Sequence, residues 1–396
     1  MLNKWSVQTI NFQLSTFNFE FTTINHELQT MNSEPSTRYY PGIDGLRCVA
    51  VFLVLLQHFA KYIARYFYTG YYGVDLFFVI SGFLVTGILL QVKGHSFKEN
   101  YFYFIGRRTL RIFPIYYLTI LILWLCAQPV VKQQLVYLLT YIFNYALILK
   151  AIPKSSVSHF WSLSVEEQFY LGWPFFVLLL KKRTGVLFVI AMAMIVTGYA
   201  QQVFSIFPAV SRYNYVSLLT RMAPLGLGAA GAIVVYKNKL PHAVFTNRVV
   251  EYAVLLLLLI TLATDYAFKL PVLGLCSLFL VLKAALYNFS CTFLNQLLHN
   301  KRVLYIGTIS YGMYVFHYPI LYFCNSIFDP FWGNINFSFL GSFQKYTWHT
   351  WIIKLPLYSL LTIGVAALSF KYIETPMLKL KNRFFTYEGS KFIVEG

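Results

Sequence analysis

Charged residues are scarce in this chain. Only 12% of its 396 residues are Asp, Glu, Lys or Arg, whereas 58% are hydrophobic and 19% are aromatic. Soluble domains carry about 25% charged residues, and they rarely contain repeated apolar runs near the roughly 20 residues that cross a bilayer. The composition therefore excludes an ordinary soluble domain and predicts a polytopic membrane protein that contacts the lipid bilayer.

Acidic residues are the scarcest of the charged ones, with 14 Asp and Glu against 32 Lys and Arg and a formal net charge of +18. The basic residues lie in short clusters between apolar runs, which is typical of cytoplasmic loops. The excess therefore indicates membrane topology, and we expect no nucleic-acid partner. The five cysteines are scattered, without the spacing of metal ligands or of a disulfide framework, so no metal site is expected.

Both ends of the chain lack long apolar runs. Residues 1–38 are polar and rich in Thr, Asn and Phe, without the charged start and apolar core of a secretory signal, and are expected to be disordered or interfacial. Residues 378–396 form a basic tail that contains Lys379, Lys381 and Arg383. The sequence thus predicts one membrane domain over residues 39–377, between a polar extension and a cytoplasmic tail.

Eleven apolar runs are candidates for membrane spans. They lie at 43–63, 73–92, 112–131, 134–152, 168–180, 185–203, 216–236, 250–267, 270–289, 303–325 and 351–373. If all eleven crossed from a cytoplasmic N-terminus, three later basic clusters would face outward, against the positive-inside bias. The weakest run is 134–152, which Asn144 interrupts. We therefore predict an all-α protein of the cell inner (plasma) membrane, with about ten transmembrane helices, a re-entrant or interfacial segment at 134–152, and both termini cytoplasmic.

The first apolar run carries three polar side chains, Asp44, Arg47 and His58. Arg47 and His58 are separated by about three helical turns, roughly 16 Å of rise, so they share one face of the helix. In the predicted topology Asp75 lies at about the depth of His58, where a carboxylate would orient and stabilise the imidazole. Ionisable groups inside a membrane suggest function, although His58 bonded to a carbonyl of a neighbouring helix is the structural alternative.

Two further ionisable groups are predicted in the same outer layer of the membrane. Glu166 opens the span near 165 from the outer side, and His317 lies in the outer half of its own span. Structural and functional roles are both open for His317. Glu167 has a structural interpretation, because Ser164 and Glu167 fit a capping box at a helix start. The candidate catalytic residues are therefore His58, Asp75, Glu166 and His317.

The loop between the second and third apolar runs is rich in arginine. Arg108 and Arg111 are three residues apart on a short amphipathic helix, so both guanidinium groups can face one anion, with Arg107 beside them. Forked donors of this kind suit phosphate oxygens. Lipid headgroups are the alternative ligand. We therefore predict that Arg107, Arg108 and Arg111 bind a phosphate group.

One glycine pattern imitates a nucleotide site. Gly226, Gly228 and Gly231 spell G-x-G-x-x-G, but they lie inside an apolar run with no strand before them. The dinucleotide fingerprint needs a strand that leads into the glycine turn. Small residues on one face of a membrane helix instead let a neighbouring backbone approach closely. We therefore interpret this pattern as a helix-packing face.

Taken together, these features resemble the acyltransferase-3 family of membrane O-acyltransferases. The matching stretches, in family order from about residue 39 to 377, are GIDGLRCVAVFLVLLQH, GYYGVDLFFVISGFLVTGILL, FIGRRTLRIFPIYYL, HFWSLSVEEQFYLGWPF, IGTISYGMYVFHYPI and YIETP. The family's arginine-ten-residues-histidine pattern matches Arg47 and His58, and its arginine-two-residues-arginine pattern matches Arg108 and Arg111. Only some twenty residues follow the last apolar run, so we expect the membrane module without the hydrolase-like domain of some relatives.

The resemblance implies that an acyl group, commonly acetyl, passes from cytoplasmic acyl-CoA (acetyl-CoA) to a hydroxyl of a carbohydrate or glycolipid at the extracytoplasmic side. It also implies that His58 is essential and that the arginines hold the donor. His58 would either deprotonate the acceptor hydroxyl or take the acyl group itself. The competing class is a polytopic transporter of a sugar or lipid-linked substrate, although no later span repeats the Arg47 and His58 arrangement. The sequence predicts neither the acceptor nor the oligomeric state.

Overall fold

The chain folds into helices of very different lengths. The computed structural model describes residues 39–60, 69–150, 152, 155–205, 214–264, 268–333 and 353–384, and all regular elements within these ranges are helical. The all-α prediction is therefore confirmed. The predicted extension at 1–38 and residues 385–396 of the predicted tail lie outside the described residues. The longer helices are α2 (Pro41–Phe59), α4 (Thr69–Gln91), α5 (Phe97–Leu125), α9 (Phe160–Leu180), α10 (Thr184–Phe204), α12 (Leu218–Tyr236), α14 (Arg248–Ala263), α15 (Lys269–Leu286), α17 (Lys301–Gly333) and α18 (Leu355–Ser369).

Seven helical segments of the described chain are long and apolar enough to cross a bilayer, which identifies a multi-pass membrane protein. They are α2, α4, α5, α10, α12, α15 and the segment 355–380, which joins α18, η4 (Phe370–Glu374) and part of α19 (Thr375–Phe384). The predicted count of about ten is not confirmed. The remaining predicted spans coincide with α9, α14 and α17. α14 has only 16 residues, whereas α9 and α17 carry polar side chains that reappear below in the candidate site.

The predicted re-entrant or interfacial segment does not form one continuous helix. Residues 129–150 fold into three short helices, α6 (Pro129–Gln133), α7 (Leu135–Leu139) and α8 (Phe143–Lys150), and Tyr141 between α7 and α8 has a positive φ of 54°. The amide of Gln168 donates to the carbonyl of Tyr141 at 2.8 Å and to the side-chain oxygen of Asn144 at 2.9 Å. Where the helix is interrupted, a backbone polar group thus forms a hydrogen bond with a side chain of the protein, as an apolar environment requires.

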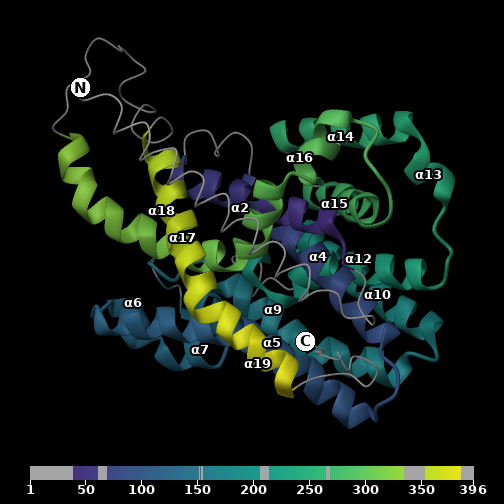
Figure 1. Cartoon of the computed structure of the whole chain (residues 1–396), viewed down its shortest axis with the longest axis horizontal. Coiled ribbons are helices and arrows are strands. Elements are labelled where there is room, and N and C mark those ends of the chain that lie inside the picture. The colour runs from purple at the N-terminus through teal and green to yellow at the C-terminus, as the bar shows by residue number, and fades with distance from the viewer. Residues whose placement is uncertain are drawn as a thin grey trace, which may run out of the picture.

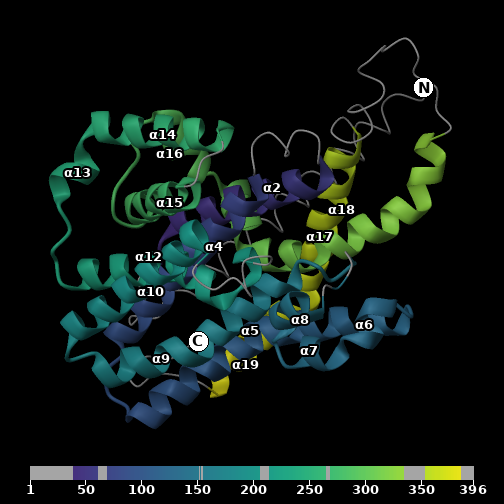
Figure 2. The same cartoon turned by 180° about the vertical axis from the view of Figure 1, so that it is seen from behind.

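The centre of the molecule is formed by α4, which packs against α2, α9, α12 and α15 (Figures 1 and 2). The crossing of α4 and α12 is close because glycines meet backbone there. A Cβ atom at Gly228 would collide with the carbonyl oxygen of Val79, and one at Gly82 with that of Leu225. The interpretation of the G-x-G-x-x-G pattern as a helix-packing face is confirmed.

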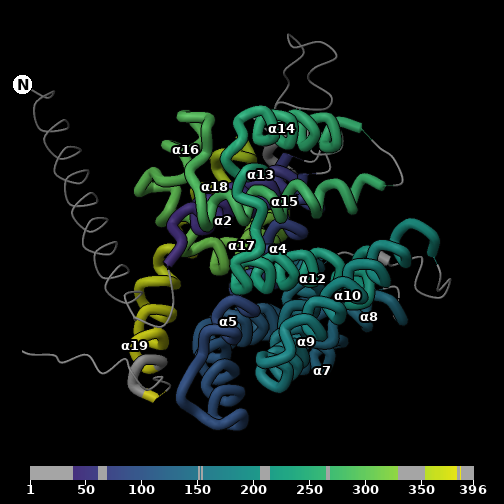
Figure 3. Tube along the Cα trace, turned by 90° about the vertical axis from the view of Figure 1, so that its right-hand side faces the viewer, coloured from purple at the N-terminus to yellow at the C-terminus, as the bar shows by residue number. Residues whose placement is uncertain are grey.

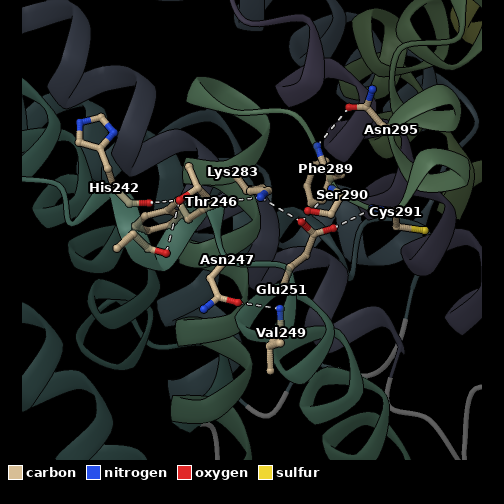
Figure 4. A network of polar contacts seen from close by, with 12 residues as sticks. His242, Thr246, Asn247, Val249, Glu251, Lys283, Phe289, Ser290, Cys291 and Asn295 are labelled. Carbon is tan, nitrogen blue, oxygen red and sulfur yellow. Dashed lines mark hydrogen bonds and ion pairs between the residues drawn. The ribbon is translucent and has the colours of Figure 1, made fainter.

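The helices form two parts on either side of α4 and α12. α5, α7 and α9 gather at one end, and α13 (His242–Thr246), α14 and α16 (Thr292–Leu298) at the other (Figure 3). In the second part, Lys283 of α15 forms a buried ion pair of 2.9 Å with Glu251 of α14. Glu251 also accepts from the backbone N–H groups of Ser290 and Cys291, at 2.9 and 3.1 Å (Figure 4). This network fixes α14, α15 and the loop before α16 to one another.

Candidate active site

Two histidines from distant parts of the chain meet in the core. His58 lies in the last turn of α2 and His317 in α17, and Nδ1 of His58 lies 3.2 Å from Nε2 of His317. Their ring centroids are 5.0 Å apart. His317 is fully buried, whereas His58 is half-buried. The structure thus brings two of the predicted catalytic residues into direct contact.

The backbone partners of these rings define their neutral tautomers. Nδ1 of His58 lies 2.9 Å from the carbonyl oxygen of Val54, and Nδ1 of His317 lies 2.6 Å from that of Tyr314. A carbonyl only accepts, so Nδ1 carries the hydrogen in each ring. Nε2 of His317 is then an acceptor, and the single Nδ1–H group of His58 is shared between it and the carbonyl of Val54. Nε2 of His58 is consequently the basic nitrogen of the pair.

A third histidine completes the cluster. His159 occupies the N-cap position of α9 without a side-chain capping bond, is 4% exposed, and donates from Nε2 to the carbonyl of Val315 at 3.1 Å. Its ring centroid lies 4.7 Å from that of His317. It also stacks on Tyr318, with centroids 5.4 Å apart and planes inclined by 18°. Despite this cluster, no group of three or more His, Cys, Asp or Glu side chains in the described ranges is arranged to hold a metal ion.

A pocket lies next to the histidines, between α2, α4, α5, α9 and α17. The cavity volume, taken as the space that the centre of a water molecule can occupy, is about 170 Å³. A single water needs only about 10–15 Å³ by this measure. The pocket is therefore large enough for part of a substrate. Its polar lining residues are Arg47, Ser81, Arg108, Arg111, Ser162, Glu166, Glu167, Tyr170, Ser310, Tyr311 and Tyr314.

A chain of polar contacts crosses one wall of the pocket. Ser81 of α4 donates to the carboxylate of Glu166 at 2.7 Å and accepts from the hydroxyl of Tyr170 at 2.9 Å. The guanidinium carbon of Arg108 lies 4.9 Å from the centroid of the Tyr170 ring. Cation–π contact and hydrogen bonds together hold Arg108 and Glu166 on a rigid wall.

The pocket mixes positive and negative charges. Arg47, Arg108 and Arg111 line it together with Glu166 and Glu167, and Arg47 also pairs with Asp44 at 3.3 Å. Glu374 of η4, in the YIETP stretch, is 3% exposed and interacts electrostatically with Arg111 and Arg47. One carboxylate oxygen of Glu167 and one of Glu374 are buried without a hydrogen-bond partner. The site therefore offers both cationic donors and unfilled acceptors.

Tyr314 joins the pocket to the histidine cluster. Its ring lines the pocket and its hydroxyl lies 2.5 Å from that of Ser162, another lining residue. The same hydroxyl lies 3.4 Å from the backbone carbonyl oxygen of His159, while the carbonyl of Tyr314 accepts from His317. A ligand in the arginine-lined pocket is thus one side chain away from the histidines.

The expected partnership of Asp75 and His58 is wrong. Asp75 pairs with Arg221 of α12 at 2.7 Å, and both side chains are essentially excluded from solvent. The guanidinium of Arg221 also lies over the ring of Tyr215, 4.2 Å from its centroid. A buried cation binds the nearest carboxylate because an unpaired charge in the core is very unfavourable. The structure gives His58 a neutral partner, His317, in place of the predicted carboxylate.

Two other expectations need correction, and a third, the donor role of Arg107, stays a prediction. Glu166 contacts Ser81 among the arginines, whereas it was expected in the layer of His58. The capping box of Ser164 and Glu167 does not form, because α9 begins at Phe160 and Ser164 donates to the carbonyl of Phe160 inside the helix. Arg107 is not among the residues that line the described pocket, unlike Arg47, Arg108 and Arg111.

The site contains residues that the sequence interpretation missed. His159 and Glu374 lie within two of the family-like stretches, HFWSLSVEEQFYLGWPF and YIETP. Their positions in those stretches could have identified them as candidate site residues. The sequence signal for Arg221 was weaker. It is a lone arginine inside an apolar run, and such a residue needs a buried partner. Nothing in the local sequence indicates that Tyr314 and Ser162 meet.

Comparisons with known proteins find relatives over most of the chain. A family model described as an acyltransferase domain, that of the acyltransferase-3 family, matches residues 40–371. The putative peptidoglycan O-acetyltransferase YrhL of Bacillus subtilis is 29% identical over 372 residues, covering 86% of this chain and 55% of the relative. The O-acetyltransferase OatA of Staphylococcus aureus is 28% identical over 384 residues, covering 90% of this chain and 60% of the relative.

The chain thus spans little more than half the length of these curated relatives. No solved structure matches it significantly. The matched range nevertheless includes the histidine cluster, the arginine-lined pocket and all the described helices before η4. On the extent of the family match, the chain belongs to the acyltransferase-3 family.

Proposed function

We propose that this protein is a membrane O-acyltransferase that moves an acyl group, acetyl in the first instance, from cytoplasmic acyl-CoA to a hydroxyl group at the extracytoplasmic side. The observation that carries the proposal is a pocket with three arginines that adjoins a hydrogen-bonded histidine pair. Both relatives described above are named as O-acetyltransferases. Family membership and site geometry therefore support the same chemistry.

The pocket is assigned to the acyl-CoA donor. Arg47, Arg108 and Arg111 supply charge-assisted hydrogen bonds to phosphate oxygens. The carboxylates of Glu166 and Glu167 accept from the amide N–H groups of the pantetheine arm, which explains why a donor site contains acidic side chains. The arm then brings the thioester past Tyr314 toward the histidines. Arg107 has no part in this assignment because it does not line the pocket.

His58 is assigned to proton transfer at the reacting hydroxyl. Its Nε2 atom is the basic nitrogen of the pair and takes the proton while the hydroxyl oxygen attacks the thioester carbonyl. The C–S bond breaks and the proton passes to the leaving thiolate. His317 stabilises the imidazolium by accepting from its Nδ1–H group, in the position that a carboxylate takes in other triads. In the alternative route, the same Nε2 atom attacks the thioester and carries the acyl group.

The acceptor is proposed to be a carbohydrate or glycolipid of the cell envelope. The printed name of YrhL includes peptidoglycan, so a peptidoglycan fragment is the first acceptor to test. The site would then work in the plasma membrane, with the donor entering from the cytoplasm and the product leaving on the other side. Both chain termini are placed in the cytoplasm in this proposal.

The test is acyl transfer by the purified protein in lipid nanodiscs, with radiolabelled acetyl-CoA and peptidoglycan fragments. We expect His58→Ala to abolish transfer, because general-base catalysis contributes about 10²–10⁴-fold. His299→Ala is the matched control, since His299 bonds the backbone carbonyl of Asn295 one turn before it and does not line the pocket. Full activity of the His58 variant would overturn the proposal. Label trapped on the protein without acceptor would favour the acyl-histidine route.

A further inference from the structure

We infer that His159 is a positioning residue that holds His317 and Tyr318 around His58. As a statement about activity this inference rests on the proposed function. As a statement about the geometry of the three rings, it is independent of that function. His159 was not needed by any step above, yet it contacts the segment of α17 that carries His317 in several places.

The first link runs through the side chain of His159. Its Nε2–H group donates to the carbonyl of Val315, two residues before His317. That bond ties the N-terminus of α9 to α17 and sets the ring beside His317, with 4.7 Å between centroids and an angle of 68° between planes. His317 therefore cannot rotate toward α9 without displacing a ring that is itself bonded to the backbone.

The second link runs through Tyr318. His159 stacks on this ring nearly parallel, and Tyr318 meets the ring of His58 edge-on, with centroids 4.9 Å apart. His58 is thus flanked by His317 and Tyr318, and each of these two rings rests on His159. A single side chain controls both neighbours of the proposed base.

The third link uses the backbone of His159. Its carbonyl accepts from Ser162 at 3.1 Å and lies 3.4 Å from the hydroxyl of Tyr314. Tyr314 in turn accepts from Nδ1 of His317 through its own carbonyl. His159 therefore holds four residues of α17, directly or through one hydrogen bond, namely residues 314, 315, 317 and 318. Few positions in a helix pair are so closely constrained.

The chemistry of His159 argues against a packing role alone. Its Nδ1 atom is buried without a hydrogen-bond partner, which is unfavourable. A phenylalanine would stack on Tyr318 in the same place without that cost. Histidine differs from phenylalanine by the Nε2–H group that donates to Val315. We therefore assign the role of this residue to that donor. Its purpose is to fix the position from which His317 accepts the Nδ1–H of His58.

Three variants separate the effect of the Nε2–H donor of His159 from the effect of its ring. His159→Gln keeps a side-chain N–H group near the position of Nε2, whereas His159→Phe keeps the ring and loses the donor. His159→Asn also has an amide, but it is too short to reach Val315. If the phenylalanine variant fails to fold, the glutamine and asparagine variants still give the same comparison, because both are small and polar.

The readout is the ¹⁵N spectrum of histidine-labelled protein in lipid nanodiscs, with the His58 signals assigned by loss in His58→Ala. We expect the wild type and His159→Gln to show His58 with Nδ1 protonated. We expect His159→Phe and His159→Asn to show a mixture of His58 tautomers. An unchanged His58 spectrum in both of these variants would overturn the inference, whatever the protein is found to catalyse.

The kinetic readout connects the inference to the proposed reaction. Loss of the donor should lower kcat by about tenfold or more, as a misplaced general base does. KM for acyl-CoA should stay unchanged, because the arginines of the pocket are untouched, and His159→Gln should restore most of kcat. A merely structural role would instead reduce the amount of folded protein without this split between kcat and KM. If the wild type transfers no acyl group, the proposed function fails while the spectrum still decides the inference.

Discussion

At the scale of single residues, two kinds of buried charge bear on the site, those that neutralise one another and those that face the pocket. Asp75 and Arg221 belong to the first kind, with exposures of 1% and 0%. Breaking such a pair by removing one partner costs about 3–5 kcal/mol, because the other charge stays buried. An activity loss in Asp75→Asn would therefore reflect lost stability, so this variant says little about His58.

Arg108 and Arg111 belong to the second kind, and they support a prediction about the donor. Replacing both by glutamine should raise KM for acyl-CoA tenfold or more, since each charge-assisted hydrogen bond contributes roughly 1.5–3 kcal/mol and 1.4 kcal/mol is a factor of ten. KM for the acceptor should hardly change. The measurement is initial-rate kinetics with each substrate varied in turn.

Arg107→Gln is the matched control for the double variant. Arg107 has the same charge and the same helix, but it does not line the pocket. Donor KM should therefore stay near that of the wild type. If the Arg107 variant weakens donor binding as much as the double variant does, the arginines act only through the general charge of this surface, and their assignment to the phosphates is lost.

At the scale of helices, the site depends on how closely α4 and α12 approach. α4 carries Ser81 of the pocket wall and Asp75 of the ion pair, while α12 carries Arg221. Gly82 makes the crossing possible because even a methyl group there would collide with the carbonyl of Leu225. Backbone contact of this kind is common where membrane helices pack through small residues. The crossing thus places residues of two separate helices within hydrogen-bonding distance.

Gly82→Ala should destabilise the protein by about 1–3 kcal/mol, as overpacking does in a dense core. Gly87→Ala is the control in the same helix, because no atom lies within 4 Å of a Cβ added there. It should be neutral or stabilising, since alanine favours a helix over glycine by about 1 kcal/mol. Thermal unfolding in detergent, followed by tryptophan fluorescence, compares the two variants. Equal unfolding temperatures would show that α4 and α12 are not in backbone contact.

At the scale of the whole molecule, the number and direction of spans decide which end of the site meets the cytoplasm. The proposed arrangement puts Lys182 and Lys237, which follow α9 and α12, on the cytoplasmic side together with the basic tail. Thr264, at the end of α14, would then lie outside. All three side chains are exposed and accessible to labelling.

Single cysteines at these positions, in a chain whose own cysteines are replaced by serine, test the arrangement. An impermeant maleimide added to intact cells should label Thr264→Cys, whereas Lys182→Cys and Lys237→Cys should react only after the cells are opened. Labelling of either lysine position from outside would refute the ten-span topology. Failure to label position 264 would show that α14, with its 16 residues, does not cross the membrane.

The sequence by itself determined where the long helices lie and which arginines share a helix face. Apolar runs predicted helices, and the structure places a helix over each of the ten runs that we interpreted as spans. The glycines of α12 indicated helix packing, because small residues inside an apolar run let neighbouring helices approach closely, and Gly226, Gly228 and Gly231 meet α10, α4 and α15. Arg108 and Arg111 were assigned to one site because three residues make almost one turn, and both line the pocket.

Only the tertiary structure decided which side chains meet across helices. His58 and His317 are 259 residues apart in the chain, and Asp75 and Arg221 are 146 apart. The periodicity of a helix shows which face a residue occupies, but the partner on the next helix is chosen by packing and by the need to neutralise each buried charge. Asp75 was therefore assigned to the wrong partner from depth alone. His159 was overlooked for the same reason, because its role exists only where the start of α9 meets α17.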